Sequence, residues 1–490
     1  ARAVCDSYGL SGRLTALINS QELTLIPMVN PDGAVANVRT NANGVDLNRD
    51  FGYMWDAWGG SPDWCSQPET RALRDDCARQ DYCLSLSYHS GAVCIIYPWM
   101  YTPVPTADDR LYKRLVWAYH SATGYDTIRS YRWYQTRGQS MDDRYGLDGT
   151  IEITAELHEF NPPPESINHR CRANYEATLY FLEKAATGIH GRVLDAVTGE
   201  PLHALVRLGP LWGGRDWFVY SAQANGDFHR PLLAGDYTLS AWAPGYAETT
   251  LDVRLPDTVT PVAVELRLRP ANSAAAFRVV SVQQNDTVGR IAPSLTHWVL
   301  GQPDARAWSM SRRGRLILDM SRPVVDAPGP DLAVFEYPDT TDTVLVSGAR
   351  NWTGPWTTLG LAVGTCSLDL AGRGIDSFRY ILVRDVSRRP NSGAYDGYDL
   401  DAVVNLNPPA AIAANPTPGA SRIPPVASIV RGSLNLTSGI SHLTSDVALL
   451  DASGRRVLSL RPGPNDLSSL PPGVYFIPAA SGLLRVVKPR

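Results

Sequence analysis

Residues 84–88, Leu84-Ser85-Leu86-Ser87-Tyr88, read as a buried β-strand, and His89 follows this strand at once. Val93 to Tyr97 reads as a second strand. Leu111 to Thr123 and Asn174 to Ala186 have the spacing of amphipathic helices. Strands that alternate with helices predict an α/β sheet that is covered on both faces.

Upstream of this region, the sequence predicts one more helix and one more strand. Leu14 to Ile18 lies in a helix-like stretch. The apolar run Leu23-Thr24-Leu25-Ile26-Pro27-Met28-Val29 reads as a buried strand. The turn Asn30-Pro31-Asp32-Gly33 is expected to end it.

Downstream of Gly188 the helical pattern disappears, and short alternating strands with turn signals such as Asn225-Gly226-Asp227 replace it. A stretch rich in Pro and Ala predicts a semi-rigid linker. The chain is therefore predicted to be multidomain, with a partial α/β domain first and three all-β sandwich domains after it. The expected boundaries are 1–187, 188–270 and 273–407, then the linker 408–425 and the last β domain 426–490.

Composition and charge exclude two classes of function. The net charge of −4 offers no basic surface for nucleic acid. No run of about 18 apolar residues exists, so the sequence predicts no transmembrane helix. The first residues are not a signal peptide and include no initiator Met, so we expect the chain to start inside a longer protein.

Seven cysteines are present, without the paired spacing of a C-x-x-C zinc site. Cys65, Cys77 and Cys83 lie in a polar stretch of loop and helix. One disulfide among these three is one interpretation, and buried free thiols are the other.

Two groups of polar residues in the first domain have the chemistry of a site. His89, at the end of a buried strand, can point a ring nitrogen into a cleft as a metal ligand, or it is a hydrogen-bonded core histidine. Arg49 beside Asn48 can clamp a carboxylate, because the guanidinium fork matches two oxygens. The alternative for Arg49 is a surface ion pair with a nearby Asp.

The stretch Ile151-Glu152-Ile153-Thr154-Ala155-Glu156-Leu157 alternates like a strand. Glu152, Thr154 and Glu156 therefore share one face. A carboxylate held in a cleft suits a general base that acts on a metal-bound water. The alternative is a pair of rim carboxylates in a salt-bridge network.

Six motifs follow one another in the first 185 residues: Asn30-Pro31-Asp32-Gly33, Gly44-Val45-Asp46-Leu47-Asn48-Arg49-Asp50-Phe51, Tyr88-His89-Ser90-Gly91, Trp133-Tyr134-Gln135-Thr136, Ser140-Met141-Asp142 and Thr154-Ala155-Glu156-Leu157. In their residues and in their order along the chain, these motifs resemble the zinc carboxypeptidases of the carboxypeptidase A type. The resemblance implies a mixed sheet with flanking helices, one zinc ion, and the C-termini of peptides or proteins as substrates.

The resemblance also implies catalytic roles for three residues. His89 would be the third zinc ligand. Arg39 would polarise the scissile carbonyl and hold the oxyanion that develops on it. Glu156 would be the general base that activates the water and then hands a proton to the leaving amine.

Five further residues are implied to bind substrate. Asn48 and Arg49 would hold the terminal carboxylate, and Tyr134 would close over it. Thr154 would line the pocket for the terminal side chain, and Met141 lies where the family sets the preference for that side chain. Met141 favours apolar terminal residues, whereas the adjacent acidic pair, residues 142–143, is an alternative that could reach a cation.

One departure from the family pattern concerns the zinc ligands. The family places a His-x-x-Glu motif upstream of the Asn-Pro-Asp-Gly turn, and none of the nine histidines here has Glu three positions later. The sheet is therefore expected to be incomplete at its N-terminus, and the chain as given inactive, because a catalytic zinc needs about three protein ligands. The alternative is a non-catalytic secreted surface-binding protein on a degenerate peptidase scaffold. The retained base and carboxylate clamp argue against that alternative.

The downstream domains also resemble known modules. Residues 191–202 and 235–246 resemble the carboxypeptidase regulatory-like (transthyretin-like) domain. Residues 273–407 look like a jelly-roll module of bacterial cell surfaces, in which Asp396, Asp399 and Asp401 could bind calcium or form a solvated rim. Residues 426–490 are similar to type IX secretion sorting domains, or form one more adhesive module. A secreted or cell-surface bacterial protein, recognised by secretion machinery, is therefore expected.

Overall fold

The computed structural model describes residues 2–159, 162–284, 295–338, 342–387 and 397–408, and near the C-terminus residues 428–429, 433–436, 447–451, 455–461, 463–479 and 482–488. The chain divides into two compact units. One unit comprises residues 29–414, and the other comprises residues 1–28 with residues 415–490. Apart from residue 408, the predicted linker 408–425 lies outside the described residues.

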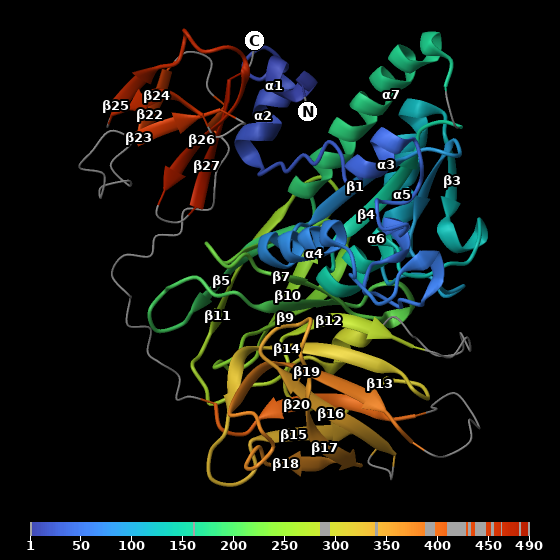
Figure 1. Ribbon diagram of the computed structural model, residues 1–490, viewed down its shortest axis with the longest axis vertical. Helices are drawn as coiled ribbons and strands as arrows, with labels where there is room; N and C mark the ends of the chain where they lie inside the picture. The colour runs from blue at the N-terminus through green and yellow to red at the C-terminus, as the bar shows by residue number, and fades with distance from the viewer. Residues whose placement is uncertain are drawn as a thin grey trace. The chain divides into compact units, whose positions relative to one another are not determined.

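The first part of the larger unit mixes helices and strands, shown in blue to green in Figure 1. The α-helices are α3 (Pro31–Ala36), α4 (Pro68–Gln80), α5 (Asp109–Thr123), α6 (Ser140–Asp143) and α7 (Pro164–Glu183). The strands are β1 (Leu84–His89), β2 (Cys94–Tyr97), β3 (Asp126–Arg129) and β4 (Ile151–Glu156). Short helical turns are η1 (Leu47–Arg49), η2 (Trp58–Gly60), η3 (Ser130–Arg132), η4 (Arg144–Asp148) and η5 (Lys184–Ala186).

These four strands form one mixed sheet in the order β1-β4-β2-β3. Strand β1 runs parallel to β4, and the register pairs His89 with Glu156 at the end of both strands. Strand β2 runs antiparallel to β4 and parallel to β3. The predicted mixed α/β sheet with flanking helices is therefore present, and its register brings two candidate catalytic residues side by side.

Helices α5 and α7 pack against each other beside the sheet, where the Tyr119 hydroxyl donates to Asn174 at 2.8 Å. Gly124 caps the C-terminus of α5, with a left-handed φ of 72° and an N–H that donates to the His120 carbonyl. Helix α4 buries Arg74, which donates to Asp148 at the end of η4. Helix α5 therefore packs against β2 and β3 of the sheet and against α7.

Residues 188–270 form two small sheets around their own apolar core. One sheet has the order β10-β9-β6-β7 and the other the order β11-β5-β8. The strands are β5 (Ile189–Asp195), β6 (Leu205–Gly209), β7 (Trp217–Tyr220), β8 (Asp227–Arg230), β9 (Gly235–Trp242), β10 (Thr249–Leu255) and β11 (Val262–Leu268), with the turn η6 (Trp212–Gly214).

Residues 273–407 form two larger sheets, β12-β14-β19-β16-β17 and β13-β20-β15-β18. We call this part the third β region. Its strands are β12 (Arg278–Gln283), β13 (Trp308–Ser309), β14 (Arg315–Val325), β15 (Leu332–Glu336), β16 (Thr343–Ala349), β17 (Thr357–Val363), β18 (Cys366–Leu368), β19 (Ser377–Asp385) and β20 (Asp399–Asn405), with the turn η7 (Thr296–Val299).

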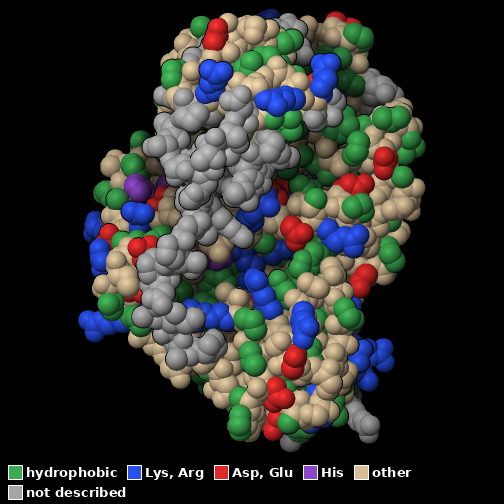
Figure 2. Space-filling model, turned by 60° about the vertical axis from the view of Figure 1, so that its left-hand side comes forward, with side chains coloured by type: hydrophobic (Ala, Val, Ile, Leu, Met, Phe, Trp, Pro, Cys, Tyr) green, Lys and Arg blue, Asp and Glu red, His purple; other side chains and the backbone are tan. Residues whose placement is uncertain are grey.

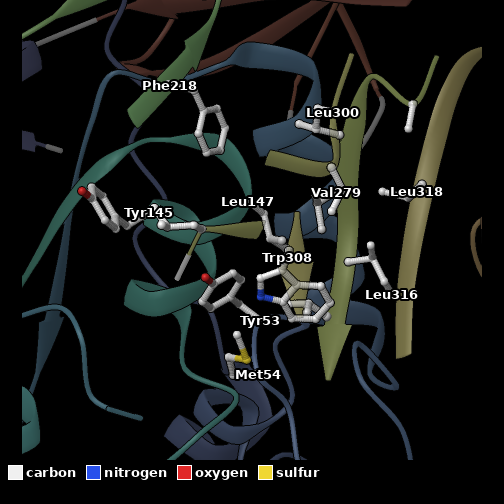
Figure 3. Close-up of a cluster of buried hydrophobic side chains, with 14 of the residues drawn as sticks. Tyr53, Met54, Tyr145, Leu147, Phe218, Val279, Leu300, Trp308, Leu316 and Leu318 are labelled. Carbon is white, nitrogen blue, oxygen red and sulfur yellow. The ribbon is translucent and has the colours of Figure 1, made fainter. Parts of the chain in front are cut away.

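One continuous apolar core joins the first sheet to both β regions. Figure 3 shows Tyr53 and Tyr145 from the first part near Phe218 from β7 and Trp308 from β13. The rings of Tyr145 and Trp217 stack with their centroids 4.5 Å apart. The parts of residues 29–414 therefore share one core, which the alternation of apolar residues did not indicate.

The smaller unit holds two short helices and a group of strands. The helices are α1 (Arg2–Ser7) and α2 (Gly12–Ser20), and α2 contains the helix predicted at residues 14–18. The strands are β21 (Ser428–Ile429), β22 (Ser433–Leu436), β23 (Val447–Leu450), β24 (Arg456–Leu460), β25 (Gly463–Asp466), β26 (Gly473–Ala479) and β27 (Gly482–Lys488). Leu449, Leu460 and Tyr475 belong to a separate apolar core.

The strand predicted at residues 23–29 was wrong. Residues 21–29 contain no strand, and the side chains of Leu25, Ile26 and Met28 are 38%, 50% and 57% exposed. A strand needs a hydrogen-bonding partner, and among the described strands the edge strand β1 pairs with β4 alone. The expected turn at residues 30–33 is instead the start of α3, where the Asn30 side chain accepts from the Gly33 N–H at 2.9 Å.

The possible disulfide among Cys65, Cys77 and Cys83 is also absent, because all three are free thiols. Cys77 is buried, and burial raises its pKa to about 12, so it behaves as a small apolar residue. The alternative interpretation, buried or partly buried free thiols, is the correct one.

The surface agrees with the modest net charge. On the face shown in Figure 2, Lys and Arg side chains stand among Asp and Glu side chains and do not form one basic patch. In the described part of the chain, no helix combines the length and apolarity that crossing a membrane requires.

Candidate active site

The centre of the candidate site is a histidine beside a carboxylate. His89 Nδ1 lies 3.9 Å from Glu156 Oε1, at the matched ends of β1 and β4. Burial lowers the pKa of His89 to about 4, and the positive charge of Arg39 adds to this, so the imidazole is neutral at pH 7. Burial raises the pKa of Glu156 to about 7. The second oxygen of Glu156, Oε2, is buried and has no hydrogen-bond partner among the described residues.

Arg39 lies in the loop after α3. Its Nε atom pairs with Asp46 at 2.6 Å, and the Arg39 side chain is 56% exposed. The Asn30 side chain, which caps α3, also donates to the Arg39 carbonyl at 3.2 Å. The charge of Arg39 affects the pKa values of both His89 and Glu156, so the three side chains lie in one region.

Arg49 and Asn48 lie together on η1. Arg49 is buried, and its Nη2 donates to the Tyr134 hydroxyl at 3.2 Å. Its guanidinium carbon lies 5.0 Å from the centre of the Trp58 ring, a cation–π contact. The Asn48 side-chain oxygen accepts from the Ser140 N–H at 3.0 Å, which leaves its amide N–H groups to donate. We call Asn48, Arg49 and Tyr134, which the sequence predicts bind a carboxylate, the carboxylate clamp.

Two supporting residues of the clamp were missed from the sequence. Trp58 stacks on Arg49 from η2, nine positions along the chain, and nothing in the local pattern indicated that contact. Asp50 is fully buried and accepts from Ser66 and Thr70 side chains and from the Gln67 N–H at 3.0 Å. The polar motif around Asp50 could have indicated this role. A buried carboxylate needs hydrogen-bond donors, and the loop that supplies them is held in place by it.

Thr154 and Met141, which the family resemblance implies line the pocket for the terminal side chain, are buried and adjacent. The Thr154 hydroxyl lies 4.0 Å from the Met141 sulfur and 2.7 Å from the Ser87 hydroxyl. Met141 packs with Ile96 and Met100 in one apolar cluster. Glu152, on the same face of β4, is buried beneath them and accepts from the Ser140 hydroxyl at 3.2 Å.

The acidic pair beside Met141 is engaged by backbone N–H groups. Asp142 accepts from the backbone N–H groups of Met100 and Tyr101 at 3.1 and 3.3 Å, and burial raises its pKa to about 7. Asp143 accepts from the N–H groups of Gly52 and Tyr53 at 2.9 and 3.0 Å. Both carboxylates hold loops, so the alternative in which they reach a cation is not favoured.

The described residues do not complete a zinc site. The neutral imidazole of His89 has the chemistry of a zinc ligand, but it is one donor where about three are needed. In the part of the chain that the structure describes, the group of acidic or ligating side chains close enough to share an ion is Asp326, Asp331 and Asp369, which lies in the third β region.

The calcium expectation in the third β region stays a prediction. Asp396 lies outside the described residues. Asp399 and Asp401 are buried on β20, and Asp401 accepts from the backbone N–H groups of residues 304 and 305 at 3.2 and 3.1 Å. Asp401 therefore holds a loop in this structure.

Known carboxypeptidases are similar to this chain in sequence. A family model described as zinc carboxypeptidase matches residues 1–177. The carboxypeptidase N catalytic chain of Homo sapiens is 32% identical over 366 residues, which cover 63% of this chain and 76% of that protein. Carboxypeptidase D of Rattus norvegicus is 30% identical over 51% of this chain and 21% of its own length, and carboxypeptidase SOL1 of Arabidopsis thaliana is 28% identical over 52% and 55%. This chain therefore belongs to the zinc carboxypeptidase family.

Proposed function

We propose that this protein is a zinc-dependent metallocarboxypeptidase, which hydrolyses the last peptide bond of peptides or proteins. The observation that carries the proposal is a buried Arg49, with Asn48 beside it, in the same region as the His89–Glu156 pair. Both Arg39 and Arg49 lower the pKa of His89 through their charge. A carboxylate binder next to a base is what removal of a C-terminal residue requires.

The carboxylate clamp accounts for exopeptidase specificity. Arg49 Nη2 donates to the Tyr134 hydroxyl, and Arg49 Nε has no partner among the described residues. A substrate carboxylate can take both donors, with a third bond from the Asn48 amide. Tyr134 is 38% exposed, so its ring can close over the bound end of the chain. An amidated or extended chain offers no such charge to the clamp.

Glu156 is proposed as the general base. With a pKa near 7, it is ionised in a large fraction of molecules at neutral pH and basic enough to take a proton from the attacking water. Its Oε2 has no hydrogen-bond partner among the described residues, so its lone pairs are free to take that proton. After the attack, the protonated carboxyl can give the proton to the leaving amine nitrogen.

Arg39 is proposed to stabilise the negative charge that forms on the scissile carbonyl oxygen. Asp46 fixes the Arg39 side chain through Nε, which leaves its terminal nitrogens to donate. Zinc would supply the Lewis acid of the family's chemistry, with His89 as one ligand. Because one imidazole does not hold a catalytic zinc, we propose that the chain as given is inactive and that the complete protein is the enzyme.

The test compares peptides that differ at one end. The complete, zinc-loaded protein is expected to cleave a peptide with a free C-terminal carboxylate and to leave its C-terminal amide intact, because the clamp needs the charge. The chain as given is expected to show no measurable turnover in the presence of added zinc, in the same assay. Cleavage of both peptides at equal rates would contradict the proposal. Binding of the acid without turnover in the complete protein would favour a non-catalytic, surface-binding role instead.

We also propose a preference for apolar terminal residues. Met141, Ile96 and Met100 form an apolar cluster at Thr154, and Asp142 is engaged by backbone N–H groups. Release of C-terminal Phe or Leu is therefore expected to exceed release of Arg or Lys by at least tenfold in kcat/KM, since a buried cation without a partner is costly. Faster release of Arg or Lys would overturn this preference.

We propose export for the whole protein, to the outside or surface of a bacterial cell. The support is the resemblance of residues 426–490 to sorting domains and of residues 188–270 to the transthyretin-like domain. The described strands β23 to β27 form a small β structure with its own core, consistent with a separable terminal domain. Fractionation of the native cells, with detection of the protein by antibody, tests this proposal directly.

A further inference from the structure

We propose that residues 281–284 of the third β region and Arg137 are positioning residues for the carboxylate clamp. The third β region would then be a working part of the substrate site and not a spacer behind it. The inference rests on the proposed function, because it assigns a supporting role to the same clamp. Two separate sets of contacts carry it, one to the chain after Arg49 and one to the loop of Tyr134.

The first set of contacts fixes Gly52, three residues after Arg49. The Val282 N–H donates to the Gly52 carbonyl at 3.0 Å, and the Ser281 hydroxyl donates to the same oxygen at 3.1 Å. From the other side, Asp143 accepts from the Gly52 N–H at 2.9 Å. The backbone that leaves the clamp is therefore bonded through its carbonyl to β12 and through its N–H to the end of α6.

The second set of contacts fixes the loop that carries Tyr134. Arg137 Nη1 donates to the Gln284 carbonyl at 2.6 Å. The Gln284 side chain in turn donates to the Ser309 carbonyl at 3.1 Å, so the acceptor is itself held within the third β region. A charged donor on a carbonyl makes a stronger bond than a neutral one.

The two segments also meet each other. The Phe51 N–H donates to the Gly138 carbonyl at 3.1 Å. Gly138 has a φ of +69°, and a Cβ atom there would lie 2.5 Å from the Arg49 carbonyl oxygen, so no other residue fits. Arg49 and Tyr134 therefore stand on two touching segments, each of which is bonded to residues 281–284.

Side-chain packing supports the same connection between β12 and the clamp. Tyr53 is fully buried and pairs with Val282 in a parallel bridge. Tyr53 and Trp308 of the third β region both belong to the shared core, and Figure 3 labels both among its side chains. A Cβ atom on Gly146 would lie 2.4 Å from the Tyr53 ring, so Gly146 packs directly against this ring. Tyr53 and β12 therefore form a closely packed interface, so the position of β12 constrains the position of the clamp.

The experiment uses the full chain and two small probes, N-acetyl-L-phenylalanine and its C-terminal amide. Calorimetry measures the affinity of each probe for the wild type and for Arg137→Ala, Arg137→Lys and Arg132→Ala. Arg132 is the matched control, because it is an exposed arginine near the start of the same loop and the described contacts give it no bond to the third β region. Hydrogen exchange of residues 47–53 and 134–140 is followed in the same variants.

Arg137→Ala is expected to weaken binding of the acid about five- to tenfold, to leave binding of the amide unchanged, and to speed exchange in both segments. Arg137→Lys is expected to recover most of the acid affinity, and Arg132→Ala to behave as the wild type. Unchanged acid affinity and unchanged exchange in Arg137→Ala would overturn the inference alone. Equal affinity of the wild type for acid and amide would contradict the clamp itself, and with it the proposed function.

Discussion

Glu156→Gln is expected to lower kcat of the complete, zinc-loaded protein by about 10²–10⁴-fold, the usual contribution of a general base. The amide is nearly isosteric but cannot take a proton from water, so the loss is chemical and not steric. Steady-state hydrolysis of a peptide with an apolar C-terminal residue measures it. Zinc content and affinity for N-acetyl-L-phenylalanine are expected to stay at wild-type values.

The matched control is Glu159→Gln, because Glu159 is an exposed glutamate just beyond β4. Its activity is expected to equal that of the wild type. The raised pKa of Glu156, about 7, also predicts the pH profile. As pH falls and the base becomes protonated, kcat/KM is expected to fall. Full activity of Glu156→Gln would contradict the role of Glu156.

Arg230→Met is expected to lower the free energy of unfolding of the 29–414 unit by about 3–5 kcal/mol, as removal of one partner of a buried ion pair does. Arg230 on β8 and Asp108 before α5 are both about 1% exposed, and they are bonded to each other. The Tyr145 hydroxyl donates to the same carboxylate at 2.6 Å, which does not neutralise its charge. Urea unfolding followed by tryptophan fluorescence measures the loss.

Two further variants separate the buried charge from other effects. Arg192→Met removes an exposed pair with Asp227 on the same sheet and is expected to cost less than about 1 kcal/mol. Arg230→Met combined with Asp108→Asn removes both charges and is expected to recover a large part of the loss. Equal stability of Arg230→Met and Arg192→Met would show that the pair does not hold residues 188–270 to the first part of the unit.

The first sheet could be predicted from sequence because its strands are short, apolar and separated by helices. Residues 84–89 and 151–156 are strands as expected, and alternation correctly placed Glu152 and Thr154 on one face of β4, since both contact Ser87. The prediction of a strand at residues 23–29 was wrong because their apolar composition suits a buried strand. Composition does not supply a pairing partner, and pairing decides whether a strand forms.

The candidate site residues were identified one by one, whereas their supports were not. Motif order pointed to His89, Glu156 and Arg49, and their proposed roles stay predictions. Trp58 over Arg49 and the contact of Arg137 with Gln284 join segments that no local pattern relates. Contacts between regions far apart in sequence depend on tertiary packing, which periodicity does not encode.

The same limit applies to the domain boundaries, which stay a prediction. Strand patterns correctly indicated β structure after residue 188, but not that its side chains would enter the core of the first part. Arg278 of β12 shows this, because it donates to Asp148 at 2.8 Å while it lies over the Tyr220 ring at 3.9 Å. When the sequence is divided into separate domains, an arginine such as Arg278 is predicted to lie on a surface.

The most direct test of the account is a crystal structure of the chain with N-acetyl-L-phenylalanine bound. The account predicts the carboxylate on Arg49 and Asn48, the ring against Met141 and Thr154, and the amide group facing Glu156 and His89. A probe bound away from these side chains, or a structure in which Arg49 and Glu156 open onto different faces, would contradict it.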